Sequence, residues 1–583
     1  MGGLAQLVAY GSQDKYLTQN PQITFFKAVY RRHTNYSVES ISQTLSGTKD
    51  FGGEMRSILS KAGDLACKMY LEVTLPEIDL STNLQVSGAS NYSVAFRWLN
   101  WIGHILIDEI KIKIGGQEID KHTGEWLHIW NELTQTSEKA EAYAEMVGNV
   151  PKLTQIYSSN SNSTTTPCKV DAYTLYIPLQ FWFNRSQAGA LPIIALQNSD
   201  VEISITFKSL DSCMWGHMVQ LDSSDTTVTD DYDVAQGSNI FSSSSGFSSS
   251  TTPSISSVKL YVDYIFLDTH ERRRFAEVAH EYLIEKVQIK INKDIASGTT
   301  QQSISLNSLS HPVKEIIWVT RANKFVDKSF TQTRGGHQYY NFTDAFDYSG
   351  FTGTPENYWG PGLRGGRAPQ NIFYGASTVK IRGELNEDNS TNNFLGGVES
   401  TSVAFNDANA TVNKDATGYA DVMQYTPVSG INKTENRYME HLLGPALSQP
   451  VLASENRVGL WSATNNNLKL FNAGKNPTTT AKITLNGTDR FSARGGDYFN
   501  LWMPHHHHTN NPAPGINVYS FAENPENHQP SGTCNFSRID DSNLEITALS
   551  TNIQNYTSNV RVYAFSYNIL RIMGGMGGLA YSS

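Results

Sequence analysis

Short runs in which apolar and polar residues alternate recur along most of this 583-residue chain. In one of them, Ile110 to Ile114, isoleucine alternates with lysine, and Gly115-Gly116 then provides a tight turn. Successive side chains of a strand point to opposite faces, so each run predicts a strand with one buried face. The other clear runs are residues 201–207, 260–266, 287–291, 516–518, 544–546 and 563–569. The chain is therefore expected to be all-β, built from sandwiches or barrels.

Apolar residues at helical spacing occur in two places. The first stripe consists of Trp126, Ile129, Trp130 and Leu133, and the alanine-bearing run 137–146 either continues that helix or follows it. The second stripe consists of Phe275, Val278, Ala279, Tyr282 and Leu283, with Asp268 or Thr269 placed to cap its amino end. We expect this second helix, residues 269–284, to join two halves of the chain.

Composition narrows the classes of protein that fit. Charged residues make up 17% and aromatic residues 11%, which gives ample apolar material for cores. A net charge of −10 argues against direct binding of nucleic acid, which needs clustered lysine and arginine. Locally the balance reverses, because the first forty residues carry Lys15, Lys27, Arg31 and Arg32 against Asp14 and Glu39, which could favour acidic partners.

The cysteines and the amino terminus indicate the type of cellular compartment in which the chain folds. The four cysteines are Cys67, Cys168, Cys213 and Cys534, and they contain no CxxC pair. This pattern predicts free thiols in a reducing environment rather than a disulfide framework or a zinc site. The sequence shows no secretory signal and no apolar run of about 20 residues, so we expect no membrane span.

The four-histidine run His505 to His508 is the most tempting candidate site. If the segment is extended, consecutive side chains alternate between faces, so at most two could converge on one metal ion. No aspartate or cysteine partner lies nearby in the sequence. We therefore expect a structural role, and a metal protein that uses these histidines remains an alternative, testable by metal analysis.

Other motifs give no reaction centre. His280-Glu281 begins like a zinc-protease helix, but Ile284 stands where the second histidine is required. The run Arg272-Arg273-Arg274 is typical of a solvated or carboxylate-paired helix face, with contact to a partner as the alternative. The chain has neither a GxSxG elbow nor a phosphate-binding GxxxxGK loop. We expect no catalytic residues, no cofactor-binding residues, no metal site and no enzymatic activity.

Long segments at both ends and in the middle carry a family resemblance. The terminal segments are residues 2–40, beginning GGLAQLVAYGSQDKYLTQNPQITFF, and residues 485–583, which include NLWMPHHHHTNNPAPGINVYSF and RVYAFSYNIL. The middle segments are residues 177–207, 264–288 and 311–319, and they stand in the family's order. In these segments the chain resembles the major capsid proteins of the large nucleocytoplasmic DNA viruses, of the chlorella-virus and mimivirus type.

This resemblance implies a specific architecture. Members of the family fold as two consecutive eight-stranded jelly rolls with long loop insertions and a few short helices. Carried over to this chain, residues 1–24 form an amino-terminal arm and residues 25–268 the first jelly roll, with an insertion at about 211–257. The helix 269–284 then links to a second jelly roll, residues 285–583, with a large insertion at about 331–480. Both insertions are rich in serine, threonine, asparagine or glycine.

The resemblance also implies a function and partners. The family's subunits form trimeric pseudo-hexagonal capsomers that tile an icosahedral shell. We therefore expect self-association, contacts of the arm with minor capsid proteins and the inner viral membrane, and contact of outer loops with host surfaces. Assembly would take place in the host cytoplasm. The alternative function, suggested by the aromatic content and by the sandwich folds of lectins, is a carbohydrate-binding or carbohydrate-cleaving protein.

Overall fold

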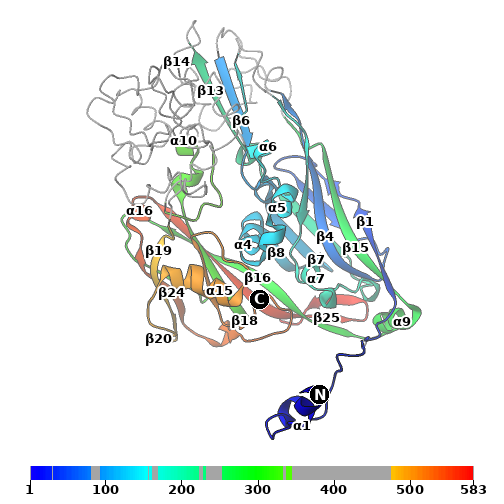
Figure 1. The fold of residues 1–583 in the computed structure, drawn as a ribbon. Helices are drawn as coiled ribbons and strands as arrows, with labels where there is room; N and C mark the ends of the chain where they lie inside the picture. The colour runs from blue at the N-terminus through cyan, green and yellow to red at the C-terminus, as the bar shows by residue number, and fades with distance from the viewer. Residues whose placement is uncertain are drawn as a thin grey trace.

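Antiparallel sheets are the main regular structure in the described part of the chain, and all strand pairs there are antiparallel (Figure 1). The computed structural model describes residues 2–28, 30–79, 92–154, 157–160, 169–221, 228–230, 253–331, 336–344 and 475–581. The strands fall into two groups that do not exchange hydrogen bonds in any described sheet. We call β1 to β15 the first half and β16 to β26 the second half.

Two main sheets form the first half. One has the order β1-β15-β4-β11, from β1 (Tyr36–Gln43), β15 (Ser257–Leu267), β4 (Leu65–Leu75) and β11 (Tyr173–Pro178). The other has the order β2-β3-β12-β7-β8, from β2 (Ser46–Gly47), β3 (Glu54–Ile58), β12 (Val201–Phe207), β7 (Ile107–Ile114) and β8 (Gln117–Thr123). Smaller sheets join β14 (Val228–Asp230), β13 (Met214–Leu221), β6 (Tyr92–Trp98) and β9 (Tyr157–Asn160), and β10 (Lys169–Val170) with β5 (Ile78–Asp79).

The predicted hairpin at Gly115-Gly116 joins β7 to β8. Both glycines have positive φ angles, 57° and 83°, which is the backbone that a two-residue hairpin turn requires. The isoleucines of β7 face inward, whereas Lys111 and Lys113 pair with Glu109 and Glu202 at the solvated face. The alternating pattern in the sequence thus predicted both the strand and its buried face.

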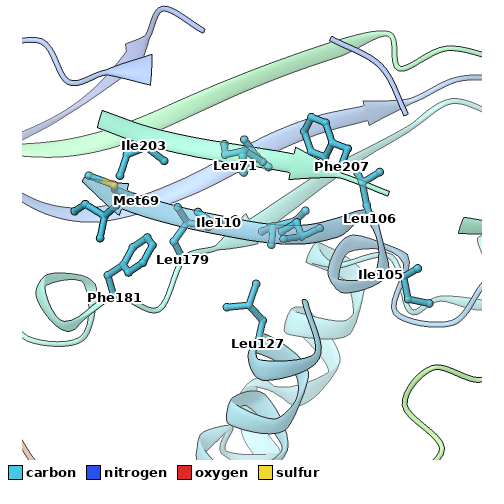
Figure 2. Close-up of a cluster of buried hydrophobic side chains, with 14 of the residues drawn as sticks. Met69, Leu71, Ile105, Leu106, Ile110, Leu127, Leu179, Phe181, Ile203 and Phe207 are labelled. Atoms are coloured by element: carbon cyan, nitrogen blue, oxygen red, sulfur yellow. The ribbon is translucent and has the colours of Figure 1, made fainter. Parts of the chain in front are cut away.

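The core of the first half lies between its two main sheets. Figure 2 shows Met69 and Leu71 of β4 pointing towards Ile110 of β7 and towards Ile203 and Phe207 of β12, and all of these side chains are buried. Leu127, from helix α4, closes the same cluster from below. Packing of two apolar sheet faces is the arrangement expected of a sandwich.

The second half repeats the two-sheet plan. One sheet has the order β16-β25-β18-β22, with β23 and β26 added, from β16 (His280–Ile295), β25 (Ser558–Met573), β18 (Pro312–Ala322), β22 (Ile516–Ser520), β23 (Cys534–Asn535) and β26 (Met576–Leu579). The other has the order β17-β24-β19-β20, with β21 added, from β17 (Gln302–Ser305), β24 (Ser542–Leu549), β19 (Thr478–Leu485), β20 (Thr488–Asp489) and β21 (Arg494–Gly495).

The described α-helices are short, and apart from α1 and α2 in the exposed amino-terminal arm they connect or cover the sheets. They are α1 (Gly2–Val8), α2 (Lys15–Thr18), α3 (Ile102–Leu106), α4 (Gly124–Thr134), α5 (Ser137–Met146), α6 (Pro151–Thr154), α7 (Trp182–Arg185), α8 (Leu210–Cys213), α9 (Thr269–Glu277), α10 (Lys328–Thr331), α15 (Met503–His507) and α16 (Thr551–Gln554). A π-helical turn, η14 (Tyr498–Trp502), precedes α15. No described helix is both long and apolar enough to cross a membrane.

The first predicted helix is present as α4, and the run 137–146 is a separate helix, α5. The second predicted helix, residues 269–284, is wrong in its length. Asp268 caps α9 by accepting from the backbone N–H groups of His270 and Glu271, but the helix ends at Glu277. Residues from His280 onward belong to β16 and pair with β25, so tertiary hydrogen bonding overrides the helical spacing of Tyr282 and Leu283.

The expected insertions lie largely outside the described residues. Within the first, 211–257, the structure shows that residues 214–221 form a strand, β13, rather than a loop. This strand pairs with β6, and its first residues, Met214 and Trp215, are buried. Most of the second, 331–480, lies outside the described part, although β19 already begins at Thr478.

Candidate functional site: the interface between the two halves

Helix α4 belongs to the first half but lies against the second (Figure 1). It follows β8, and its N-cap Thr123 accepts a hydrogen bond from the backbone N–H of Trp126 at 3.2 Å. Gly124 allows the helix to approach α3, because a β-carbon there would lie 1.9 Å from the carbonyl oxygen of His104. The helix is consequently fixed at its first turn.

The apolar stripe of α4 packs on the β16-β25-β18-β22 sheet of the second half. Trp126 lies 5.6 Å from Tyr563 and Trp130 lies 5.2 Å from Phe565, measured between ring centroids. One buried cluster contains Trp126, Ile129, Trp130 and Leu133 from α4 together with Val287, Ile317, Val319, Phe342, Ile516, Val518, Tyr563 and Phe565 from the second half. Since Leu127 on the opposite face of α4 enters the core of the first half, this helix is shared by both halves.

Glu125 adds a buried ionic contact beside this cluster. Its Oε2 lies 3.3 Å from Nη1 of Arg321 and also contacts Arg561, and its Oε1 accepts a hydrogen bond from the hydroxyl of Tyr563 at 2.5 Å. Burial is the main cause that raises the pKa of Tyr563 well above its ordinary value, and the negative charge of Glu125 raises it further. The hydroxyl therefore remains protonated and acts as a donor. A first-half carboxylate thus binds three second-half side chains.

Glu285 makes the reciprocal contact from the second half. Its Oε2 lies 2.7 Å from Nη1 of Arg185 in the first half, and its Oε1 lies 2.7 Å from the fully buried Nζ of Lys314. Burial lowers the pKa of Lys314 to about 8, against the opposing effect of the Glu285 charge. Lys314 also lies 3.8 Å from the centroid of the Phe565 ring. Loss of either partner would leave a charge buried without compensation.

Two further contacts close the interface. The buried carboxylate of Asp120 in β8 accepts a hydrogen bond from the backbone N–H of Val287 in β16 at 3.2 Å. At the end of β25, the turn to β26 meets the first half, where Asn198 donates its backbone N–H to Gly575 and its side-chain amide to Gly574, at 2.9 and 3.1 Å. The glycine-rich end of the chain is therefore a docked hairpin.

Truncation of the shared helix tests this interface. We expect Trp130→Ala to lower the free energy of unfolding by about 3–5 kcal/mol, because the side chain is buried against the second half. Chemical denaturation with fluorescence detection measures the change. Trp502→Ala is the matched control, since that side chain is 55% exposed, and it should have little effect. Equal stability of the two variants would contradict the interface.

The docked hairpin can be tested through a glycine. Gly575 has φ +80°, and an added β-carbon would lie 2.8 Å from the side-chain amide nitrogen of Asn198. Gly575→Ala should therefore destabilise the protein by about 1–3 kcal/mol, from backbone strain and the clash together. Gly116→Ala is the control. Its φ is +83° and the new β-carbon would lie in open space, so this variant measures the cost of backbone strain alone. The larger loss for Gly575→Ala in denaturation experiments measures the docking.

The four-histidine run is mainly helical, which corrects the expected extended segment. His505 to His507 lie in α15, where Pro504 suits the first turn because it needs no N–H donor there. His505 and His506 are exposed, and the Nδ1 of His507 lies 2.8 Å from the carbonyl oxygen of Glu523. Within the described residues, no group of three or more His, Cys, Asp and Glu side chains is arranged to hold a metal ion.

His508 is the member of the run with a defined structural role. Its Nε2 lies 2.9 Å from Glu315 in β18, and its Nδ1 lies 2.9 Å from Glu526. Burial lowers the pKa of His508, but the two carboxylates outweigh this effect and raise it to about 9. The protonated ring therefore binds the segment that contains Glu526 to the second-half sheet.

This histidine gives the stability a pH dependence. Its folded pKa of about 9 lies above the ordinary 6.5, so its contribution is complete below about pH 6.5 and is lost as pH rises through about 9. The difference corresponds to about 3 kcal/mol. We expect urea denaturation of the wild type to lose about this much more stability than His508→Gln does between about pH 6 and about pH 9.5. Parallel pH profiles of the two proteins would contradict this assignment.

The other candidates from the sequence make local structural contacts. The ring of His280 lies 2.8 Å from the carbonyl oxygen of Phe275, and Glu281 pairs with Arg571 at 2.8 Å. Arg272 pairs with Asp64 at 3.0 Å. Cys67, Cys213 and Cys534 are free thiols, whereas Cys168 lies outside the described residues.

Comparison with known proteins finds capsid protein families along nearly the whole chain, in agreement with the resemblance seen in the sequence. The family described as "Major capsid protein N-terminus" matches residues 24–268, and "Large eukaryotic DNA virus major capsid protein" matches residues 271–578. The major capsid protein of Phaeocystis pouchetii virus is 40% identical over the full length of both chains. Capsid protein 1 of Acanthamoeba polyphaga mimivirus is 35% identical, also over both full lengths.

Solved structures show the same fold. The quasi-atomic model of the PBCV-1 virus capsid matches with a TM-score of 0.56 at 25% identity, over 96% of this chain and 100% of that one. The Faustovirus major capsid protein matches with a TM-score of 0.57 at 11% identity, over 98% and 96%, which bears on the fold alone. The two sandwiches joined through a shared helix are thus those of a double jelly-roll viral capsid protein.

The chain belongs to the major capsid protein family of the large eukaryotic DNA viruses, and it is a structural component of the virion capsid. The fold class and the capsid function that the resemblance implied are confirmed. The alternative of a carbohydrate-binding or carbohydrate-cleaving protein is replaced by this assignment, which rests on relatives matched end to end.

Proposed function

We propose that three copies of this chain form a pseudo-hexagonal capsomer of an icosahedral shell, and that the role is structural and non-enzymatic. The observation that carries this proposal is the fixed interface between two sandwich halves. A ring of three such two-part blocks presents six similar lobes around one threefold axis, and a near-hexagonal block of this kind can tile with its neighbours.

The proposal assigns a role to each part of the chain. Residues 1–24 form the arm, residues 25–268 the first jelly roll, residues 269–279 the link that contains α9, and residues 280–583 the second jelly roll. The arm faces minor capsid proteins and the inner viral membrane. Outer loops within the insertions 211–257 and 331–480 contact host surfaces. Assembly takes place in the host cytoplasm, without direct contact to nucleic acid, which the net charge of −10 disfavours.

The oligomeric state tests this proposal. We expect multi-angle light scattering of the purified full-length chain to give three times the mass of one chain, because an obligate contact of about 2,000–5,000 Å² persists on dilution. Negative-stain images should show a threefold, near-hexagonal outline. A stable monomer would count against the proposal, and a monomer that bound glycans would favour the carbohydrate-binding alternative.

A further inference from the structure

The segment at residues 336–344 belongs to the second half but lies against the first, and we call it the strap. It follows α10 and is the last described segment before residues 345–474. Its first residue, Gly336, has φ +101°, and an added β-carbon would lie 2.7 Å from the side chains of both Leu99 and Trp215 in the first half. A residue without a side chain permits this approach, so the strap is closely fitted to the first half.

Two buried histidines of the first half support the middle of the strap. The Tyr340 ring stacks on the ring of His128 in α4, with the centroids 4.3 Å apart and the planes inclined by 11°. The ring of His104 in α3 lies 5.8 Å from that of His128, and its Nε2 lies 2.8 Å from the hydroxyl oxygen of Tyr143 in α5. The strap therefore covers a cluster to which three helices of the first half contribute.

Polar atoms of this cluster are buried without a partner. The Nδ1 atoms of His104 and His128 and the hydroxyl oxygen of Tyr340 have no hydrogen-bond partner among the described residues. Burial lowers the pKa of His104 to about 3 and holds that of His128 well below its ordinary value. A positive charge placed on either ring would be desolvated, so the closed strap requires both rings to be neutral.

The strap contributes a third histidine of its own. The Nδ1 of His337 lies 3.1 Å from the hydroxyl oxygen of Thr331 in α10. Burial, with a smaller effect from the charge of Lys328, lowers the pKa of His337 to about 4, although Asp327 opposes this shift. The closed strap therefore favours a neutral ring at this position as well.

The charged groups around the strap also favour neutral rings. Glu125 on α4 is already held by Arg321. Lys208 and Arg321 both contact Tyr339, the first with its Nζ 4.6 Å from the ring centroid and the second through a hydrogen bond of 2.9 Å to the carbonyl oxygen, and both oppose a further positive charge. The titratable groups that pack around the strap and the two helical histidines are Lys208, Asp211 and Cys213 at α8, Glu125 on α4, Tyr143 on α5, Arg321 on β18, Asp327 and Lys328 at α10, and Tyr339 and Tyr340.

Acid acts on the three histidines in one direction. Because their folded pKa values lie below the ordinary 6.5, the stability that they contribute to the closed strap is complete above about pH 6.5 and is lost as the pH falls below it. His508 has the opposite sign, since its raised pKa keeps its contribution complete in acid. A fall in pH therefore weakens the strap while the second-half sheet keeps its ion pairs.

We propose that the strap is an acid-sensitive switch, in which protonation of His104, His128 and His337 releases the strap from the first half while both sandwiches stay folded. The strap leads directly into residues 345–474, so its release changes how the second insertion is attached to the body of the subunit. The switch lies within one chain and does not depend on the number of copies in a capsomer. It adds a response to pH that a structural role does not by itself require.

Hydrogen exchange of the purified full-length protein, read by mass spectrometry at about pH 7.5 and about pH 5, tests this switch. Protection factors are compared, because they correct for the intrinsic pH dependence of exchange. Strap peptides that contain Gln338, whose backbone N–H donates to the carbonyl oxygen of Phe325 at 2.9 Å, should lose about 30-fold or more in protection at the lower pH. This is the factor for one histidine that regains an ordinary pKa of about 6.5 on opening. Peptides from β7 and β12 should keep their protection.

Glutamine variants assign the effect to particular rings. His128→Gln and His337→Gln each remove one titrating ring, and each should reduce the ratio of strap protection between the two pH values by about 30-fold relative to wild type. The ratio is compared within each variant, so a change in stability at neutral pH does not affect the test. His270→Gln is the matched control, because this histidine is exposed in the first turn of α9, and it should reproduce the wild-type ratio.

Three results would overturn the proposal. The first is unchanged strap protection of the wild type at the lower pH, which requires no variant to fold. The second is an equal loss of protection in the β7 and β12 peptides, because that result shows acid unfolding of the whole subunit. The third is a wild-type pH response in both His128→Gln and His337→Gln, which assigns the effect to other groups.

Discussion

The packing of α4 between the two halves is the interaction on which the rest of the structure depends. One face of the helix enters the first core through Leu127, and the other covers the second-half sheet through Trp126, Ile129 and Trp130. Removal of the helix would expose Tyr563 and Phe565, which now lie buried beneath it, to water. Each half has its own sandwich, yet the second half cannot bury this sheet face without the first.

Buried ion pairs surround this apolar contact and fix its geometry. Apolar packing is tolerant of small shifts, whereas Glu125 and Glu285 require their partners at hydrogen-bond distance. A misplaced half would leave these carboxylates desolvated and unpaired, which is costly. The ionic contacts therefore favour one orientation of the halves, and a subunit that must fit identical neighbours benefits from a single shape.

The sequence predicted the strands well because their alternation reflects one buried face, as at Ile110 to Ile114 and at Val201 to Phe207. It failed where tertiary contacts decided the outcome. Tyr282 and Leu283 have helical spacing but lie in β16, and the histidine run is helical because Pro504 starts a turn after a π-helical segment. The interface was missed because its partners, such as Glu125 and Arg561, are hundreds of residues apart. The one local signal was Lys314-Glu315, two charges inside the apolar strand β18.

The docked hairpin at Gly574-Gly575 has a consequence for biogenesis. The first half precedes the second in the chain, so it emerges and folds earlier during synthesis. Its surface at Asn198 nevertheless stays uncovered until β25 and β26 have been made and have paired. Completion of the first lobe is thereby coupled to completion of the second. A prematurely terminated product would carry an unfinished flank, which gives the assembling lattice a physical basis for rejecting incomplete subunits.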